Sequence, residues 1–361
     1  MGASIRRYLT PLGLVAGDAA GPLVRSGAAR PLGNTGLAFT ALSVATRREG
    51  GGATRDIHSV ATLPAEFAGV LAEFEAALAG LADDPLTALG LPADRPLVMG
   101  IVNTTPDSFS DGGRHLGEAG IAHGRALAAA GADILDIGGE STRPGAEDVP
   151  VAEELDRVVP VIRGLAGIGI PISVDTRKAA VMEAALDAGA AIVNDVSALG
   201  HDPAARALVA RRDVPVILMH AQGQPKTMQA DPRYDDVLLD LHDWFRARLD
   251  WCREGGIAHG RTILDPGIGF GKTVAHNVAL MDSLPLFFGL GRPLLLAASR
   301  KRFIASLSDG EEADRRLGGS LAAALAGIAR GARLVRVHDV AETAQALRVA
   351  RAIAAAGTPR G

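Results

Sequence analysis

Residues 172–195, ISVDTRKAAVMEAALDAGAAIVND, contain the repeating unit of the chain. A short apolar run at 172–175 is followed by an alanine-rich stretch of helical spacing at 179–188, and then by a second apolar run at 191–195. Short apolar runs bounded by turn residues are typical of buried parallel strands, which need a crossover helix between them. The segment therefore predicts a strand, a helix and a second, parallel strand.

The same alternation continues in both directions from this segment. Strand-like apolar runs occur at 97–102, 133–137, 172–175, 191–195, 214–219, 262–265, 294–298 and 333–337. Stretches of helical spacing lie between them, among them 119–130, 151–165, 179–188 and 238–254. Eight strand–helix units within about 265 residues match the count and size of an α/β fold, the (β/α)8 barrel. A doubly wound sheet would also alternate, but it fits eight continuously apolar strands without an edge strand less well.

Residues 1–95 do not follow this alternation, so we predict an N-terminal extension in front of a barrel at 96–361. The extension has a glycine-rich break at 50–52 and one strand-like run at 37–44. A helix is predicted after Pro64, because apolar residues recur on one face; they are Phe67, Val70, Leu71, Phe74, Leu78 and Leu81. No set of residues suited to catalysis occurs here, so the expected role is packing or support of a dimer.

Composition excludes several classes of protein. Of the 361 residues, 48% are hydrophobic and 22% are charged, which excludes a disordered chain. The net charge of −4 predicts no surface for nucleic acid or for an anionic membrane. No apolar run reaches the roughly 18 residues that span a bilayer, and Pro11, Gly13 and Asp18 interrupt a candidate export signal. Cys252 is the only cysteine, which fits a reducing compartment and predicts a cytoplasmic protein.

Polar residues follow nearly every predicted barrel strand. They are Asn103, Glu140, Asp175, Asn194, Asp195, His220, Asp265, Ser299, Arg300, Lys301, Arg336 and His338. The carboxyl ends of the strands of such a barrel lie at one face, where the active site is formed. The sequence therefore predicts that these side chains converge, in an enzyme or a small-ligand binder.

The residue types at these strand ends indicate a ligand. Asp175, Asn194 and Asp265 suit a flat heterocycle rich in N–H groups, because a carboxylate accepts two parallel hydrogen bonds. Arg336 and His338 are two residues apart and face the same side of their strand. Together with Asn103 they could hold a phosphorylated group and Mg²⁺, which prefers oxygen ligands.

Other common ligand motifs are missing from the chain. Gly271-Lys272-Thr273 resembles the end of a phosphate-binding loop, but the glycine that the motif requires at position 266 is Pro266. No G-x-G-x-x-G follows the first barrel strand, which disfavours a dinucleotide-binding fold. The histidines are scattered and Cys252 stands alone, so no zinc-type cluster is predicted.

Eight motifs in order along residues 96–356 resemble the dihydropteroate synthase family. They are MGIVNTTPDSFSDGG (99–113), LDIGGESTRPGA (135–146), ISVDTRK (172–178), IVNDVSAL (192–199), LMHAQGQPKTMQ (218–229), LDPGIGFGKT (264–273), SRK (299–301) and RVHDV (336–340). The resemblance implies a transferase of folate biosynthesis that joins (7,8-dihydropterin-6-yl)methyl diphosphate to 4-aminobenzoate. It also implies a cytoplasmic homodimer that uses Mg²⁺.

Site roles carry over from this resemblance. The pterin is implied to be bound by Asp175, Asn194, Asp265, Lys301 and Arg336. The diphosphate is implied to be bound by Asn103, Thr142, Arg336 and His338, with Mg²⁺ at Asn103. The 4-aminobenzoate pocket is implied to contain Phe109, Thr142, Arg143, Pro144, Ser299 and Lys301. The implied catalytic residues are Asp175, Lys301, Arg336 and His338.

The family's reaction resembles an SN1 process, in which diphosphate leaves before the amine attacks. Loops after the first two strands, at 104–113 and 140–145, are expected to close over the site and exclude water. Two alternatives remain open at this point. The chain could be the pterin-binding domain of a methyltetrahydrofolate-type methyltransferase, or a catalytically silent paralogue.

Overall fold

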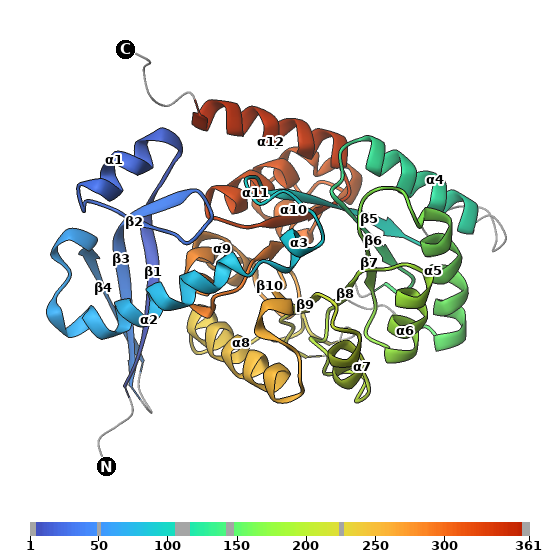
Figure 1. Cartoon of the computed structure of the whole chain (residues 1–361), viewed down its shortest axis with the longest axis horizontal. Helices are drawn as coiled ribbons and strands as arrows, with labels where there is room; N and C mark the ends of the chain where they lie inside the picture. The colour runs from blue at the N-terminus through green and yellow to red at the C-terminus, as the bar shows by residue number, and fades with distance from the viewer. Residues whose placement is uncertain (1–4, 49–51, 105–115, 142–147, 224–226, 356–361) are drawn as a thin grey trace.

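The computed structural model describes residues 5–48, 52–104, 116–141, 148–223 and 227–355. Two sheets organise this part of the chain, an antiparallel sheet of four strands and a parallel sheet of eight (Figure 1). In Figure 1 the antiparallel sheet lies at one side of the parallel sheet, and helices surround the latter. No helix in the described residues is long and apolar enough to cross a membrane.

The parallel sheet is a closed barrel. Its strands are β5 (Leu97–Asn103), β6 (Ile134–Gly138), β7 (Ile172–Asp175), β8 (Ile192–Asp195), β9 (Val216–Met219), β10 (Thr262–Asp265), β11 (Leu295–Leu296) and β12 (Leu334–Val337). They pair in the order β10-β9-β8-β7-β6-β5-β12-β11. A parallel bridge between Leu264 and Leu294 joins the two ends of this order. The predicted (β/α)8 barrel is therefore confirmed.

Helices follow the barrel strands and pack around them. They are α4 (Leu116–Ala129), α5 (Val151–Leu165), α6 (Ala179–Ala188), α7 (Ala205–Arg212), α8 (Val237–Glu254), α9 (Val274–Asp282), α10 (Arg302–Leu307), α11 (Leu317–Ala329) and α12 (Val340–Ala355). Local signals set their ends. The Asp236 side chain accepts hydrogen bonds from the first turn of α8, and Gly189 ends α6 with a φ of +118°.

The barrel interior is filled with aliphatic side chains below the carboxyl ends of its strands. This inner layer consists of Leu97, Met99, Ile134, Ile192, Ile217, Ile263, Leu295 and Leu334, and it packs on Leu86 and Leu91. Leu86 belongs to the short helix α3 (Pro85–Ala88). The intervening strand residues, such as Val98, Leu135 and Val335, belong to the larger core that the helices cover. This inside–outside alternation decides which strand residues can reach a site at the end of the barrel.

The extension contains more strands than the sequence predicts. It has β1 (Ile5–Ala16), β2 (Arg30–Pro31), β3 (Leu37–Arg48) and β4 (Ala53–Ser59), with the short helix α1 (Ala20–Arg25) and the helix α2 (Ala68–Ala79). The predicted single strand at 37–44 is part of β3, which pairs with the other three strands. The helix prediction is confirmed, because Leu71, Phe74 and Leu78 of α2 are buried in the core.

Apolar and charged contacts join the antiparallel sheet to the barrel. Tyr8 of β1 packs with Leu239 of α8 and with Leu286 of the 3-10 helix η7 (Leu284–Leu290). The Tyr8 hydroxyl donates to Asp243 at 2.8 Å. Arg47 of β3 contacts Asp240 at 2.5 Å, on the same helix. The sheet is therefore held against α8 and η7.

Candidate active site

Charged and amide side chains meet at the carboxyl ends of the barrel strands. Each lies two residues beyond an inward-facing residue: Asn103 after Ile101, Asp136 after Ile134, Asp175 after Ser173, Asn194 after Ile192, Asp265 after Ile263 and Arg336 after Leu334. Because side chains of a strand alternate between its faces, all six point inward. Polar residues thus replace the aliphatic layer at this end of the barrel.

Arg336 is held between two carboxylates. Its Nε donates to Asp136 Oδ2 at 2.6 Å, and its Nη2 donates to Asp175 Oδ2 at 2.7 Å. Asn194 Nδ2 donates to the same Asp136 oxygen at 3.0 Å. The other oxygens of both carboxyl groups, Asp136 Oδ1 and Asp175 Oδ1, are buried and have no hydrogen-bond partner. Two buried acceptors without donors are costly, and a ligand with N–H groups would satisfy them.

Electrostatics at this cluster favour positive charge in a ligand. Burial raises the pKa of Asp175 to about 7, Arg336 opposes that change and Asp136 adds to it. Burial also lowers the Arg336 pKa, but the charges of Asp136 and Asp175 outweigh this and raise it overall. Burial leaves the carboxylates of Asp175 and Asp265 poorly solvated, so positive charge placed beside them is favourable. Arg336, Lys301 and Lys272 already act on Asp265.

Lys301 and Asp265 form the other side of the cluster. Lys301 Nζ donates to the Ile268 carbonyl and lies 4.7 Å from the centre of the Phe270 ring. Burial lowers the Lys301 pKa to about 8, although the Asp265 charge raises it. Asp265 Oδ1 accepts from Gly267 N at 2.7 Å, and burial raises the pKa of this carboxyl group. The ammonium group is thus positioned by the segment that follows β10.

Ser299 and His338 lie next to each other where two neighbouring strands end. Ser299 Oγ accepts from the His338 backbone N–H at 3.2 Å and lies 3.1 Å from His338 Nδ1. With its oxygen accepting from the backbone, the hydroxyl can donate to Nδ1, which leaves the ring proton on Nε2. His338 is then able to donate from Nε2 to an anionic group.

Several residues expected at this face point elsewhere. His220 follows inward-facing Met219, so it faces outward, where its ring meets the Trp244 ring of α8 at 4.8 Å. Asp195 binds the backbone N–H groups of Ser197 and Leu199 and so shapes a turn. Arg300 pairs with Asp339. Prediction by strand end alone was wrong here, because adjacent residues of a strand face opposite ways.

Glu140 also has a structural partner. It accepts hydrogen bonds from Arg177 and from the Val149 backbone. Burial alone would raise the Glu140 pKa, but these contacts hold it below its ordinary value. Glu140 thus anchors the polypeptide on both sides of residues 142–147. The predicted ligands Phe109, Thr142, Arg143 and Pro144 lie outside the described residues.

Sequence reasoning missed Asp136. It lies inside the apolar run 133–137 rather than after it, and its side chain is fully buried. A charged residue at an inward position of a buried strand, two residues after Ile134, is a signal that period-two alternation would have detected.

Comparison with known proteins identifies the family. The model of the pterin binding enzymes matches residues 99–338. The dihydropteroate synthase of Neisseria meningitidis serogroup B is 52% identical over 266 residues, which cover 72% of this chain and 93% of that protein. This chain belongs to the dihydropteroate synthase family. The enzyme of Escherichia coli K12 is 46% identical over 265 residues, covering 73% and 93% of the two chains.

Solved structures of the dihydropteroate synthase family have the same fold. The Xanthomonas albilineans enzyme with 4-aminobenzoic acid has a TM-score of 0.69 and 51% identity, covering 74% of this chain and 95% of that one. The same enzyme with 7,8-dihydropteroate has a TM-score of 0.67 and 48% identity, covering 74% and 97%. Membership of this family makes the chain a transferase of folate biosynthesis. The match to the family model begins at residue 99, so the antiparallel sheet lies outside it.

Proposed function

We propose that the side chains at the carboxyl end of the barrel join (7,8-dihydropterin-6-yl)methyl diphosphate to 4-aminobenzoate, giving 7,8-dihydropteroate and diphosphate. The observation that carries this assignment is the pair of buried, unpartnered oxygens, Asp136 Oδ1 and Asp175 Oδ1. They lie in one cluster with Asn194 and Arg336. A pterin ring bears several N–H donors in one plane, which is the complement of such a set.

The pterin is proposed to lie against this cluster. Asp175 and Asp265 accept from its N–H groups, while Asn194 and Lys301 offer donors to its acceptor atoms. The guanidinium of Arg336 stays in place because two carboxylates bind it, so it can stack on the ring. Burial of the cluster strengthens each of these contacts relative to water.

Departure of diphosphate requires cations and donors near the Arg336 side of the site. Arg336 and His338 Nε2 are proposed to stabilise the charge on the leaving group, with Thr142. The Asn103 side chain faces inward at the end of β5 and forms no hydrogen bond in the described structure, so its amide oxygen suits Mg²⁺. Mg²⁺, when bound, supplies charge neutralisation for the diphosphate oxygens.

The covalent change is proposed to follow an SN1-like route. The bond between the pterin methylene carbon and the diphosphate oxygen breaks, and its electron pair leaves with diphosphate. The buried carboxylate of Asp175, which pairs with Arg336, stabilises the cation that remains. The lone pair of the 4-aminobenzoate amine then forms the C–N bond, and the amine loses a proton.

4-Aminobenzoate is proposed to bind beside the pterin. Ser299 and Lys301 are the described residues of this pocket, which also includes Phe109, Thr142, Arg143 and Pro144. Lys301 lies between the Asp265 side of the pterin site and the Phe270 ring, so it can contact both substrates. Closing segments are expected to exclude water, which would otherwise capture the cation.

Three further assignments complete the proposal. Residues 96–361 form the pterin-binding barrel, and residues 1–95 are an N-terminal extension with a role in packing or in support of a dimer. The protein acts in the cytoplasm, which is supported by the free thiol of buried Cys252. It acts as a homodimer, as the resemblance to its family implies.

The test is release of diphosphate by purified protein with the pterin diphosphate and Mg²⁺, with and without 4-aminobenzoate. We expect dihydropteroate only when both substrates are present. Asp136→Asn should lower kcat/KM by at least about tenfold, because it removes a charge that binds Arg336. Asp213→Asn is the matched control, since Asp213 pairs with Arg261 on the surface. Pterin binding without turnover, or equal activity of the two variants, would contradict the proposal.

A further inference from the structure

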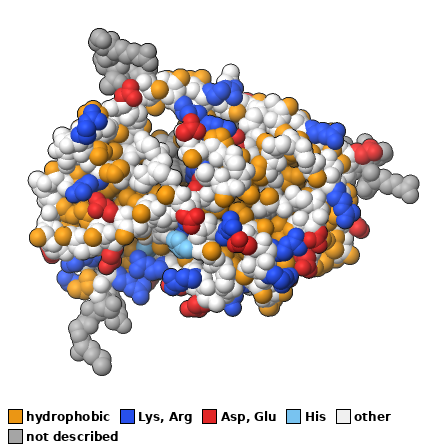
Figure 2. Space-filling view, in the orientation of Figure 1, with side chains coloured by type: hydrophobic (Ala, Val, Ile, Leu, Met, Phe, Trp, Pro, Cys, Tyr) orange, Lys and Arg blue, Asp and Glu red, His pale blue; other side chains and the backbone are white. Residues whose placement is uncertain are grey.

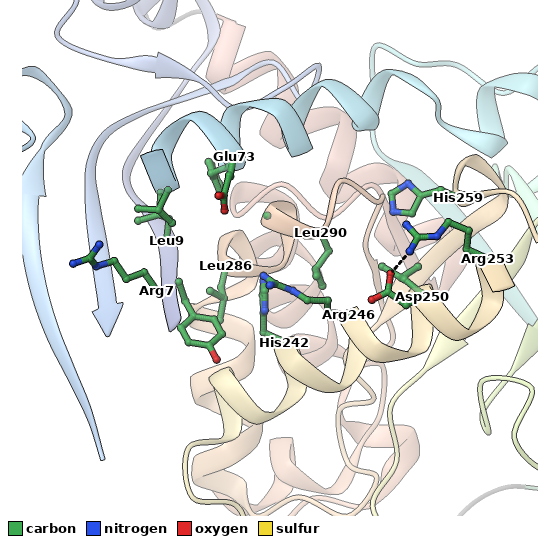
Figure 3. Close-up of a pocket in the computed structure, with 15 residues that line it drawn as sticks. Arg7, Leu9, Glu73, His242, Arg246, Asp250, Arg253, His259, Leu286 and Leu290 are labelled. Carbon is green, nitrogen blue, oxygen red and sulfur yellow. Dashed lines mark hydrogen bonds and ion pairs between the residues drawn. The ribbon is translucent and has the colours of Figure 1, made fainter. Parts of the chain in front are cut away.

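A pocket of about 280 Å³ lies between the extension and the barrel, away from the active site (Figure 3). Its extension wall comes from β1 and α2, and its barrel wall comes from α8, η7 and the 3-10 helix η6 (His259–Arg261). Neither wall forms the pocket alone. The volume is close to the lower end of the range for small-ligand sites, about 300–1,000 Å³.

Two hydrogen-bond donors lie together on the barrel wall. His242 is 3% exposed, and its Nδ1 is buried without a partner. An unpaired buried acceptor costs less than an unpaired buried N–H, so the ring proton belongs on Nε2. A Cβ added at Gly289 would lie 3.7 Å from Nε2, so the missing side chain at Gly289 leaves this nitrogen open to the pocket.

Arg246 is the second donor. Figure 3 shows its side chain reaching along α8 toward His242. Among the described residues it has no hydrogen bond and no ion-pair partner. Its charge helps burial to lower the His242 pKa to about 3, so His242 stays neutral and donates through one nitrogen only. A guanidinium beside a neutral N–H donor suits the two oxygens of a carboxylate.

The remaining charges limit the ligand to one negative charge. Arg253 is paired with Asp250 at 2.8 Å, and Arg7 is directed toward the Phe67 ring, at 5.2 Å. Glu73 of α2 also lines the pocket and points down toward the space above Leu286 in Figure 3. A doubly charged phosphate would be repelled by the Glu73 and Asp250 carboxylates. A ligand with one negative charge, bound at Arg246, can lie away from both carboxylates.

The rest of the lining is mostly apolar. It consists of Leu9, Val70, Phe74, Leu249, Leu286 and Leu290, together with the Tyr8 and His259 side chains. Figure 2 shows a pale-blue histidine side chain on the surface of this face of the molecule. We propose that this pocket binds a small carboxylate with an apolar body, held by Arg246 and His242 and covered by β1 and α2.

Such a ligand could be a simple carboxylic acid or an apolar amino acid. The carboxylate contacts are the same in both cases. An amino acid would also place its ammonium group near Glu73, which has no hydrogen bond or ion pair in the described structure. A simple carboxylic acid and an amino acid are therefore distinguished by whether an added ammonium group strengthens binding.

The test is calorimetric titration of the full-length protein with three matched probes: 3-phenylpropanoate, its amide 3-phenylpropanamide, and L-phenylalanine. The titrations are repeated with Lys301→Arg, which changes the proposed 4-aminobenzoate site, so that binding in the active site is recognised by its loss. We expect the acid to bind about tenfold or more tightly than the amide. Tighter binding of L-phenylalanine than of 3-phenylpropanoate assigns an amino acid, and weaker binding assigns a simple acid.

Variants locate the binding site. Arg246→Gln should weaken the acid about tenfold and leave the amide unchanged, and Arg246→Lys should recover part of the loss. Arg211→Gln makes the same charge change at an exposed ion pair on α7 and should have no effect. Circular dichroism checks that each variant is folded. Equal binding of acid and amide, unchanged binding by Arg246→Gln, or no binding of any probe at millimolar concentration would refute the proposal.

Discussion

Asp175 and Lys301 carry their charges in the active site at a cost to the stability of the empty protein. Burial raises the pKa of Asp175 to about 7 and lowers that of Lys301 to about 8. Because the pKa of Asp175 is higher in the folded state than in the unfolded state, protonation of this carboxyl group favours folding. The contribution is complete below the unfolded pKa of about 3.9, and it is lost as the pH rises to about 7. Lys301 behaves in the opposite way, because its pKa is lower in the folded state. Its contribution to the stability of the fold is present above about pH 10.4 and is lost as the pH falls to about 8.

Asp175→Asn should therefore separate stability from activity. Near pH 8.5 the ligand-free variant should melt on the order of 2–4 °C above the parent protein, because it carries no ionised group at this position. The difference should shrink as the pH falls toward about 5, where Asp175 is protonated. Arg336 keeps Asp136 as its partner in the variant. Dihydropteroate formation should fall at least about tenfold.

Thermal unfolding over a pH series, alongside the activity assay, tests this prediction. A lower melting temperature for Asp175→Asn at high pH would show that the ion pair with Arg336 outweighs the cost of burial. The interpretation that the buried charge of Asp175 destabilises the ligand-free protein would then be wrong, whether or not the activity of the variant falls.

Lys301→Arg tests whether the shape of the cation matters as well as its charge. Lys301 Nζ fits between the Ile268 carbonyl and the face of the Phe270 ring. A planar guanidinium is larger and cannot take the place of a compact ammonium group between two substrates. We expect kcat/KM to fall at least about tenfold. Arg302→Lys, at the exposed next residue, is the control and should retain activity. Turnover close to normal in Lys301→Arg would refute the idea.

The sequence predicts most of this cluster because strand ends are readable from apolar runs. Asp175 and Asp265 are the last residues of their strands, as the sequence predicts. His220 and Asp195 show the limit of that reasoning, since a shift of one residue turns a side chain to the other face. Asp136 was not predicted, because this charged residue lies inside an apolar run rather than at its end. Contacts among these residues depend on packing that no single segment specifies.

Between the elements, Lys178 joins the ends of the segment that contains Thr142 and Arg143. Its Nζ donates to the Val149 carbonyl at 2.6 Å, pairs with Glu154, and lies 3.2 Å from Glu140. Glu154 is fully buried in α5. Burying a charge is tolerated when it is paired, so this lysine connects β6, α5 and the start of α6.

Lys178→Met should lower the free energy of unfolding by about 3–5 kcal/mol, because it leaves the buried Glu154 carboxylate without its cation. The double variant Lys178→Met with Glu154→Gln should recover part of that loss, since no unpaired charge remains there. Denaturant unfolding measures both. An unchanged stability of Lys178→Met, or a double variant that is weaker than the single one, would show that the pair does not hold this junction.

Elements outside the barrel were harder to predict, for a local reason. β1 contains Pro11 and Gly13, which interrupt the alternation by which a strand is detected. The structure accommodates both because β1 pairs on one side only, with β3, and Gly13 adopts a φ of +61°. The Gly13 carbonyl then accepts from the Thr40 hydroxyl. Antiparallel pairing over 5–16 and 37–48 depends on both strands together, which a local pattern does not contain.

At the scale of the whole molecule, the extension and the barrel are joined at buried polar contacts as well as at the sheet. Arg292 is fully buried just before β11. It donates to the carbonyls of Gly80 at 3.2 Å, Asp83 at 2.9 Å and Thr262 at 3.0 Å. Gly80 and Asp83 follow α2, while Thr262 begins β10. One side chain thus connects the end of the extension to two neighbouring barrel strands.

Arg292→Met should therefore loosen the whole molecule. The variant keeps much of the side-chain volume but leaves three buried carbonyls without their donor, which should cost about 3–5 kcal/mol. Because the lost contacts join both parts, we expect one unfolding transition in the parent protein and a separate, earlier one in the variant. Arg330→Met is the control, since Arg330 bonds Asp282 at the surface and should change stability by less than about 1 kcal/mol. Denaturant unfolding followed by circular dichroism decides the question. If Arg292→Met unfolds like the control, the extension is held by the sheet against α8 and η7, and the arginine contributes nothing to the junction.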